Sequence, residues 1–141
     1  MFNQILVVCT GNICRSPMSE YLFKRVRPDL HISSAGIAGL TGYPADERAI
    51  LSMDRLSIDM HAHVAQKLNR EHLIKADLVL VMDLQQQKYI EQNWPFTKGK
   101  VFRLGHWHNM DIADPFQQDQ QFFYNTCQLI QDCVDDWVKY L

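Results

Sequence analysis

A short, β-branched apolar run at Gln4 to Val8 leads directly into a turn-rich stretch and then into a helix start at Ser16-Pro17. The run is long enough for a buried strand and too short for a helix. Serine can cap free helix amides and proline suits the first helical turn, so we expect Ser16 to cap this helix. The beginning of the chain therefore predicts a strand, a loop and a helix in direct succession.

The rest of the chain continues this alternation. Further strands are expected at 30–34, 77–82 and 100–104, and further helices at 46–56, 84–93 and 122–141. Strands alternating with helices are typical of a parallel sheet covered on both faces. With right-handed crossovers we expect an α/β, flavodoxin-like three-layer fold with a four-stranded parallel sheet in the order 2-1-3-4. The ligand site should then lie at the carboxyl ends of the strands, beside the loop after the first strand.

Composition limits the class of protein. A chain of 141 residues with 47% hydrophobic content suits one domain, expected to span residues 1–141. Its 14 basic and 16 acidic residues give a net charge of -2, without the basic excess that nucleic-acid binding usually needs. The apolar run from Ile5 to Val8 is too short for a signal or membrane segment. We expect a cytoplasmic protein with no nucleic-acid partner and no membrane insertion.

The strand-to-helix loop reads Cys9-Thr10-Gly11-Asn12-Ile13-Cys14-Arg15-Ser16, with five residues between a cysteine and an arginine. A loop of this length can point successive N–H groups inward as an anion-binding nest, which the helix dipole reinforces. Arg15 adds a planar fork for two phosphate oxygens. Helix N-termini and nearby cations favour the ionised form of cysteine, so Cys9 is expected to react as a thiolate. Gly11 is expected to allow a positive φ or a close backbone approach.

Two other interpretations fit parts of this loop. Cys9 could be a small buried hydrophobe at a strand end, with Arg15 as a surface charge. A nucleotide-binding phosphate loop would require the pattern G-x-x-x-x-G-K-[ST], which the sequence lacks. The context of strand, loop and helix favours the reactive nest.

The segment Val7 to Glu20, VVCTGNICRSPMSE, resembles the signature of the low-molecular-weight protein tyrosine phosphatases. The resemblance extends through Ser33-Ser34-Ala35-Gly36, Val81-Met82-Asp83 and Asp114-Pro115-Phe116, and so spans essentially the whole chain. It implies a phosphatase that forms a cysteinyl-phosphate, with Cys9 as nucleophile, Arg15 as phosphate clamp and Asp114 as general acid. The substrate-binding residues expected from the loop and the resemblance together are Thr10, Gly11, Asn12, Ile13, Cys14, Ser16, Leu40 and Phe116.

Asp114 owes its expected role to chemistry as well as to resemblance. Departure of a tyrosyl oxygen requires a proton, which a carboxyl group on a loop can deliver. Pro115 biases Asp114 toward an extended conformation, and Phe116 offers a ring that can pack on the ring of the substrate. Asp-Pro alone is more often a structural turn, and the resemblance reverses that preference.

Several polar residues near the loop have both a structural and a functional interpretation. By resemblance, Ser16 also donates a hydrogen bond to the Cys9 sulfur, and Asn12 and Ser34 hold the shape of the loop. Asp83 either caps the following helix or supports the loop. Cys14 either forms a protective disulfide with oxidised Cys9, as the resemblance implies, or is a passive thiol.

The remaining cysteines and the histidine pairs favour structural roles. Cys127 and Cys133 lie among apolar residues of the last predicted helix, so we expect them to pack in the core. The pairs His61/His63 and His106/His108 have a spacing that metal ligands can use, but no carboxylate or cysteine pattern completes either pair. The expected chemistry requires no metal and no cofactor.

The segment Lys100 to Phe116 resembles bacterial members of the family that are paired with tyrosine autokinases of capsule or exopolysaccharide assembly. The implied partner is therefore a phosphotyrosine protein, namely a tyrosine autokinase. A thiol-coupled arsenate reductase is the nearest alternative, but it needs redox cysteines near the site, and Cys127 and Cys133 lie about 120° apart around their predicted helix. A noncatalytic phosphotyrosine-binding module would need neither a reactive thiol nor a proton donor.

Overall fold

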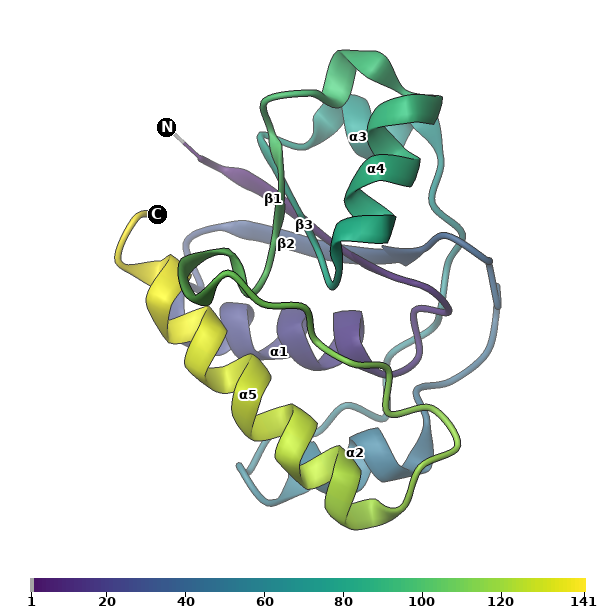
Figure 1. Cartoon of the computed structure of the whole chain (residues 1–141). Helices are drawn as coiled ribbons and strands as arrows, with labels where there is room; N and C mark the ends of the chain where they lie inside the picture. The colour runs from purple at the N-terminus through teal and green to yellow at the C-terminus, as the bar shows by residue number, and fades with distance from the viewer. Residues whose placement is uncertain (1) are drawn as a thin grey trace.

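The computed structural model describes residues 2–141 and consists of a parallel sheet between two layers of helices (Figure 1). The sheet order is β2-β1-β3-β4, so the predicted α/β three-layer fold and its order 2-1-3-4 are confirmed. The strands are β1 (Gln4–Cys9), β2 (His31–Gly36), β3 (Leu78–Val81) and β4 (Val101–Arg103).

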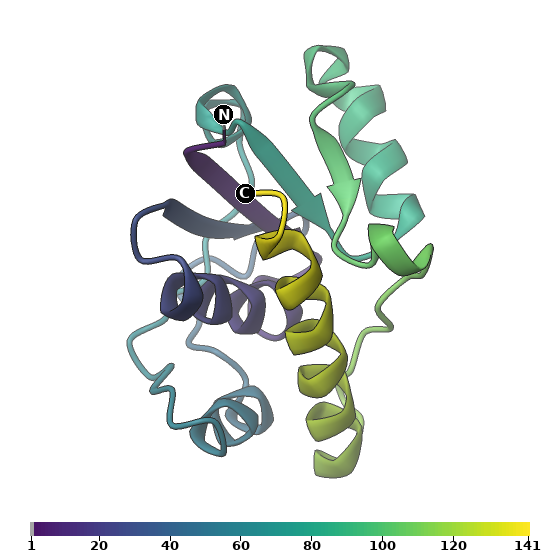
Figure 2. The same ribbon diagram turned by 90° about the vertical axis from the view of Figure 1, so that its left-hand side faces the viewer.

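The helices cover both faces of the sheet. They are α1 (Arg15–Val26), α2 (Glu47–Asp54), α3 (Arg70–Lys75), α4 (Leu84–Asn93) and α5 (Gln120–Val138), with the short 3-10 helices η1 (Pro95–Thr97) and η2 (His106–His108). Helices α1, α2 and α5 share one core with the sheet, while α3 and α4 pack on the opposite face (Figures 1 and 2). No helix within residues 2–141 is long and apolar enough to cross a membrane.

Strand β1 is apolar because it is buried on both faces. Ile5, Val7 and Cys9 belong to the core shared with α1, α2 and α5, whereas Leu6 and Val8 belong to the core under α3 and α4. Successive side chains of a strand point to opposite faces, so this division follows from the pleat alone. Cys9 is the last residue of β1 and therefore lies at the carboxyl end of this interior strand.

The expected element boundaries hold to within a few residues, but the three short helices α3, η1 and η2 were not predicted. Asp46 and Asp119 accept hydrogen bonds from the first-turn amides of α2 and α5, and these caps fix where the two helices begin. Helix α3 has only six residues, and Leu73 is its one buried side chain, so it lacks the apolar periodicity that marks longer helices.

The end of β2 lies directly against the loop that follows β1. Cys9 pairs with Gly36 in the parallel register. A Cβ atom added at Gly36 would lie 2.9 Å from the Asn12 nitrogen, the Gly11 carbonyl carbon and the Thr10 oxygen. Only glycine therefore allows the loop backbone to approach β2 this closely.

Candidate active site

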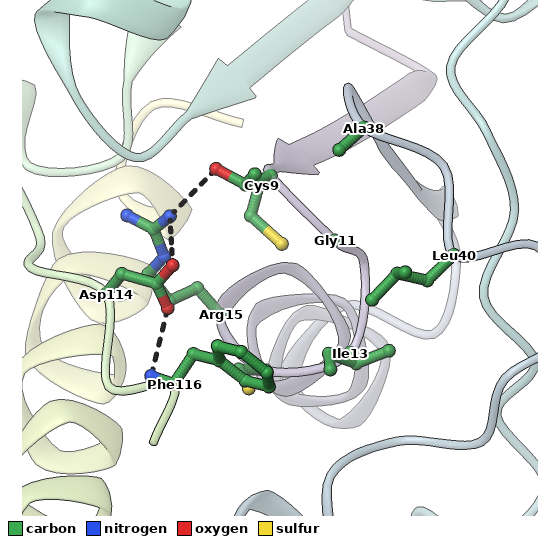
Figure 3. Close-up of a pocket in the computed structure, with 10 residues that line it drawn as sticks. Cys9, Gly11, Ile13, Arg15, Ala38, Leu40, Asp114 and Phe116 are labelled. Carbon is green, nitrogen blue, oxygen red and sulfur yellow. Dashed lines mark hydrogen bonds and ion pairs between the residues drawn. The ribbon is translucent and has the colours of Figure 1, made fainter. Parts of the chain in front are cut away.

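A cavity of about 140 Å³ opens at the carboxyl end of β1, where the loop after this strand curls toward the N-terminus of α1 (Figure 3). Its floor comes from the loop, and its walls come from the segment after β2 and from the segment before α5. The lining residues are Cys9, Thr10, Gly11, Ile13, Cys14, Arg15, Ala38, Leu40, Asp114 and Phe116.

The Cys9 sulfur lies between two polar partners. Its Sγ is 3.0 Å from Ser16 Oγ, and the Asn12 backbone N–H donates to it across 3.2 Å. Ser16 is the second residue of α1 and does not cap the helix, so the predicted cap is wrong. The helix begins one residue earlier, at Arg15, and the Ser16 hydroxyl is engaged by the sulfur instead of by a backbone amide.

Asn12, and not Gly11, carries the unusual backbone conformation of the loop. Its φ is 59°, in the left-handed region that asparagine tolerates better than most residues. Gly11 has no positive φ, so the first of its two expected alternatives does not apply. The space at Gly11 is nevertheless limited, because an added Cβ would lie 3.0 Å from Leu40 Cδ1.

The Asn12 side chain ties the loop to its surroundings, as predicted. Its Nδ2 donates to Ser16 Oγ at 2.8 Å and to Ser34 Oγ at 2.9 Å, while its Oδ1 accepts from the Gln66 backbone N–H at 2.9 Å. Its backbone oxygen contacts His63 Nε2 at 2.7 Å. The loop is therefore held from β2 and from the 63–66 segment.

Arg15 is almost fully buried, and its guanidinium is already fixed. Its Nη1 donates to the Ile112 carbonyl at 2.7 Å, and its Nη2 lies 3.6 Å from an Asp114 oxygen. Asp83 lies 3.8 Å from Nη1 and also accepts a hydrogen bond from the Gln86 backbone N–H at 2.8 Å. Both interpretations of Asp83, helix cap and support of the loop, therefore describe contacts that exist.

Asp114 and Phe116 form the exposed side of the cavity. The Asp114 side chain is 46% exposed, and its Oδ1 accepts from the Phe116 N–H at 3.1 Å (Figure 3). Phe116 is also nearly half exposed and faces the cavity together with Leu40 and Ile13. The cavity that contains the Cys9 sulfur is therefore lined at its exposed side by one carboxyl group and by apolar side chains.

The other thiols are buried. Burial, reinforced by the charge of Asp46, raises the pKa of Cys14 far above the usual range of a thiol. Burial also raises the pKa of Cys127 and of Cys133 to about 11. The last two belong to the core between α5 and the sheet, as predicted. All three are expected to stay protonated at neutral pH.

The histidine pairs have other partners. His63 contacts the loop, His61 contacts Asp59, and His108 contacts Asp136. Within residues 2–141 no group of three His, Cys, Asp or Glu side chains is arranged to hold a metal ion.

A strand, an anion loop and a helix N-terminus thus enclose a cysteine, an arginine and a nearby carboxyl group. Residues 4–141 match the protein family described as low molecular weight phosphotyrosine protein phosphatase. The chain belongs to this family. Its enzyme class is therefore that of a low-molecular-weight protein-tyrosine-phosphatase, a phosphoric monoester hydrolase.

Individual members of the family match this chain over nearly its whole length. The low molecular weight protein-tyrosine-phosphatase Ptp of Acinetobacter johnsonii is 61% identical over 140 residues, which cover 99% of both chains. The structure of Vibrio vulnificus Wzb in complex with benzylphosphonate is 37% identical, covers both chains completely and has a TM-score of 0.96. The YwlE arginine phosphatase from Geobacillus stearothermophilus is 30% identical, with a TM-score of 0.93 over 98% of this chain and 92% of that one.

The structure brings most of the predicted site residues of this phosphatase together. The three predicted catalytic residues line the cavity, as do Thr10, Gly11, Ile13, Cys14, Leu40 and Phe116. Asn12 and Ser16 are completely buried behind the loop and contact the sulfur or its supports. Their geometry points to positioning of the loop and of Cys9 rather than to contact through the cavity.

Sequence reasoning missed several supports of the loop. Gln86 accepts from the Met82 N–H and donates to Thr10 Oγ1, and Ala38 lines the cavity. For His63 the sequence indicates only a spacing from His61 that metal ligands can use, and no contact with the loop. The local sequence around His63 does not predict its contact with the Asn12 carbonyl, because the two residues are 51 positions apart in the chain.

Proposed function

We propose that this protein hydrolyses phosphotyrosine in two steps through a cysteinyl-phosphate, with Cys9, Arg15 and Asp114 in the catalytic roles. The observation that carries the proposal is the position of Cys9 Sγ, which lies at the floor of the cavity with Ser16 Oγ and the Asn12 N–H around it. Donors directed at sulfur stabilise a thiolate, which is the nucleophilic form of cysteine.

In the first step the Cys9 thiolate attacks phosphorus and the bond to the tyrosyl oxygen breaks. Asp114 donates its proton to that oxygen, so tyrosine leaves as a neutral phenol. The loop amides and the Arg15 fork hold the three remaining phosphoryl oxygens while charge redistributes. The planar fork suits two of these oxygens together, which a lysine ammonium does not.

In the second step water attacks the cysteinyl-phosphate. Asp114 is now ionised and accepts a proton from this water, the S–P bond breaks, and inorganic phosphate and the Cys9 thiolate are released. The exposure of Asp114 suits both steps, because the same carboxyl group must meet first the leaving oxygen and then a water molecule.

The apolar rim supports an aryl phosphate as substrate. Ile13, Leu40 and Phe116 present carbon surface at the mouth of the cavity, where an aromatic ring gains both burial and ring contact. Vibrio vulnificus Wzb, a relative with the same fold, binds benzylphosphonate, which also joins an aromatic ring to a phosphorus group. Because another relative is described as an arginine phosphatase, phosphoarginine is the sharpest competing substrate.

For the physiological substrate we propose a tyrosine autokinase of capsule or exopolysaccharide assembly, acting in the cytoplasm. This part of the proposal rests on the resemblance of the segment Lys100 to Phe116. We further propose that residues 1–141 form one catalytic domain, which the family match over 4–141 supports.

A panel of substrates tests the proposal. Phosphotyrosine is expected to be hydrolysed much faster than phosphoserine or phosphoarginine, with no loss of rate in a chelator, and arsenate with thiol is expected to be reduced negligibly. Cys9→Ser should be folded and inactive, because a serine hydroxyl is not ionised in this nest and attacks poorly. Rapid quenching of wild type should trap phosphate on Cys9. Faster turnover of phosphoarginine, or an active serine variant, would contradict the proposal.

A further inference from the structure

A continuous series of buried hydrogen bonds joins the Cys9 sulfur to a carboxylate that does not line the cavity. Cys9 Sγ contacts Ser16 Oγ at 3.0 Å, and Asn12 Nδ2 bridges Ser16 Oγ and Ser34 Oγ. Ser34 Oγ then donates to Glu20 Oε1 at 2.5 Å. Glu20 is only 8% exposed, although charged residues on helices are normally at the surface.

The direction of each hydrogen bond in this series follows from the groups at its ends. A carboxylate can only accept, and the second oxygen of Glu20 already accepts from Lys24 Nζ, so Ser34 must donate its single proton to Glu20. The Ser34 oxygen is then left as an acceptor for Asn12 Nδ2.

The Asn12 amide is fixed in the same way. Its Oδ1 accepts from the Gln66 N–H, so Nδ2 faces the two serines and donates one proton to each. Ser16 therefore accepts from Asn12, and its own proton is free to point at the Cys9 sulfur. The same anchored Asn12 supplies the backbone N–H that donates to this sulfur.

We infer that Glu20 is a positioning residue for the nucleophile, acting through Ser34 and Asn12. By holding the Ser34 hydroxyl in one orientation, it anchors Asn12 in its left-handed conformation and keeps both donors directed at Cys9. Asn12 has a φ of 59°, and a residue other than glycine keeps such a conformation only when contacts with its neighbours hold it there. The inference rests on the proposed role of Cys9 as nucleophile and adds to it a residue from the second turn of α1.

The sign of the effect distinguishes this role from simple electrostatics. If Glu20 acted only through its negative charge, removing it would favour the Cys9 thiolate and lower the pH at which Cys9 ionises. If Glu20 acts through the hydrogen bonds, removing it weakens two donors to the thiolate and raises that pH. A purely structural role would change the thermal midpoint of unfolding and leave the ionisation of Cys9 unchanged.

The test is the pH dependence of Cys9 alkylation by iodoacetamide, located by mass spectrometry, with the thermal midpoint of each variant measured in parallel. Glu20→Leu is expected to raise the pH midpoint of alkylation by roughly 0.5 to 1 unit, because the two donors are weakened but not removed, and complete loss of one hydrogen bond to a charged group would shift the midpoint by about 1 to 2 units. Glu20→Gln keeps an acceptor for Ser34 and should stay close to wild type. Ser34→Ala should reproduce the rise.

The double variant completes the test. In the Ser34→Ala background, Glu20→Leu should add little, because the pathway is already broken. An unchanged or lowered midpoint in Glu20→Leu, or fully additive shifts in the double variant, would overturn the inference. If Glu20→Leu does not fold, Glu20→Ala takes its place, since it also removes the acceptor for Ser34 and the inference requires the same rise from it. Alkylation does not depend on turnover, so phosphatase activity tests the proposed function separately.

Discussion

The loop from Cys9 to Arg15 and the segment from Ile112 to Phe116 meet at one cavity but are held very differently. In the loop, Asn12 and Arg15 are buried and bonded to several other segments. In the second segment, Asp114 and Phe116 are close to half exposed, and the hydrogen bond between them is local. One side of the site is rigidly supported and the other is open to solvent.

This difference matches what each side has to do. Groups that stabilise developing charge work best when they need no rearrangement, so the phosphate-binding loop gains from a buried polar framework. Within residues 2–141 no buried side-chain nitrogen or oxygen lacks a hydrogen-bond partner, which shows how completely that framework is satisfied. A proton donor must instead reach a leaving group and then water, and exposure allows both.

Among substitutions on the buried and the exposed side of the cavity, Arg15→Lys should reduce phosphotyrosine hydrolysis the most. Arg15→Lys keeps the charge but loses the two-point fork and the hydrogen bond to the Ile112 carbonyl. We expect kcat/KM for phosphotyrosine to fall by about 10³ to 10⁵, as for arginines that contact transferring phosphoryl groups elsewhere. Steady-state kinetics measures the loss. Arg48→Lys is a matched exposed control, and equal activity of Arg15→Lys and this control would argue against the clamp.

Substitution of Asp114 should have a smaller effect that depends on the leaving group. Asp114→Asn is expected to slow phosphotyrosine hydrolysis by about 10² to 10⁴, the usual contribution of a general acid. An aryl phosphate with a much more acidic phenol should be slowed far less, because its phenolate leaves without a proton.

The reactivity of Cys9 provides the control for Asp114. Alkylation of Cys9 should be unchanged in Asp114→Asn. Equal slowing of both substrates would indicate damaged binding or folding instead of a lost proton transfer.

Substitution of Phe116 should have the smallest effect. Phe116→Ala removes the ring from the exposed rim without touching the buried framework. An aromatic contact is worth about 0.5 to 1.5 kcal/mol beyond its burial, so KM for phosphotyrosine should rise by about 2- to 13-fold with a smaller change in kcat. Phe116→Tyr should retain most of the affinity. A large fall in kcat for Phe116→Ala would show that the segment needs this ring to hold Asp114.

The sequence predicted the layers of the fold and the gathering of Cys9, Arg15 and Asp114 at one cavity, because the strands and the loop leave local signals. The apolar run before Cys9 marks the central strand, and the spacing from Cys9 to Arg15 marks the anion loop. For Gly11 the sequence predicts a positive φ or a close backbone approach, whereas it is Asn12 that takes the left-handed conformation, with its side chain held by Ser34, Gln66 and Ser16.

The supports of the loop could not be predicted from local patterns. His63 and Gln66 contact Asn12 from 51 and 54 residues away, and no periodicity or motif marks those pairs. Glu20 lies within the recognised signature, yet its burial and its contact with Ser34 follow only from the packing of α1 against β2. Helix α3 was missed because six mostly polar residues carry almost no pattern.

These long-range contacts also set an order for folding. The hydrogen bonds that fix Asn12 close chain loops of 22, 51 and 54 residues, whereas the helices form by contacts between residues three or four apart. Native contacts that are distant in sequence form late, because the entropy of closing the loop opposes them until the rest of the structure is in place. During refolding, helical circular dichroism should therefore return before the thiolate reactivity of Cys9, and a chain emerging from the ribosome should acquire its secondary structure before it acquires a nucleophile.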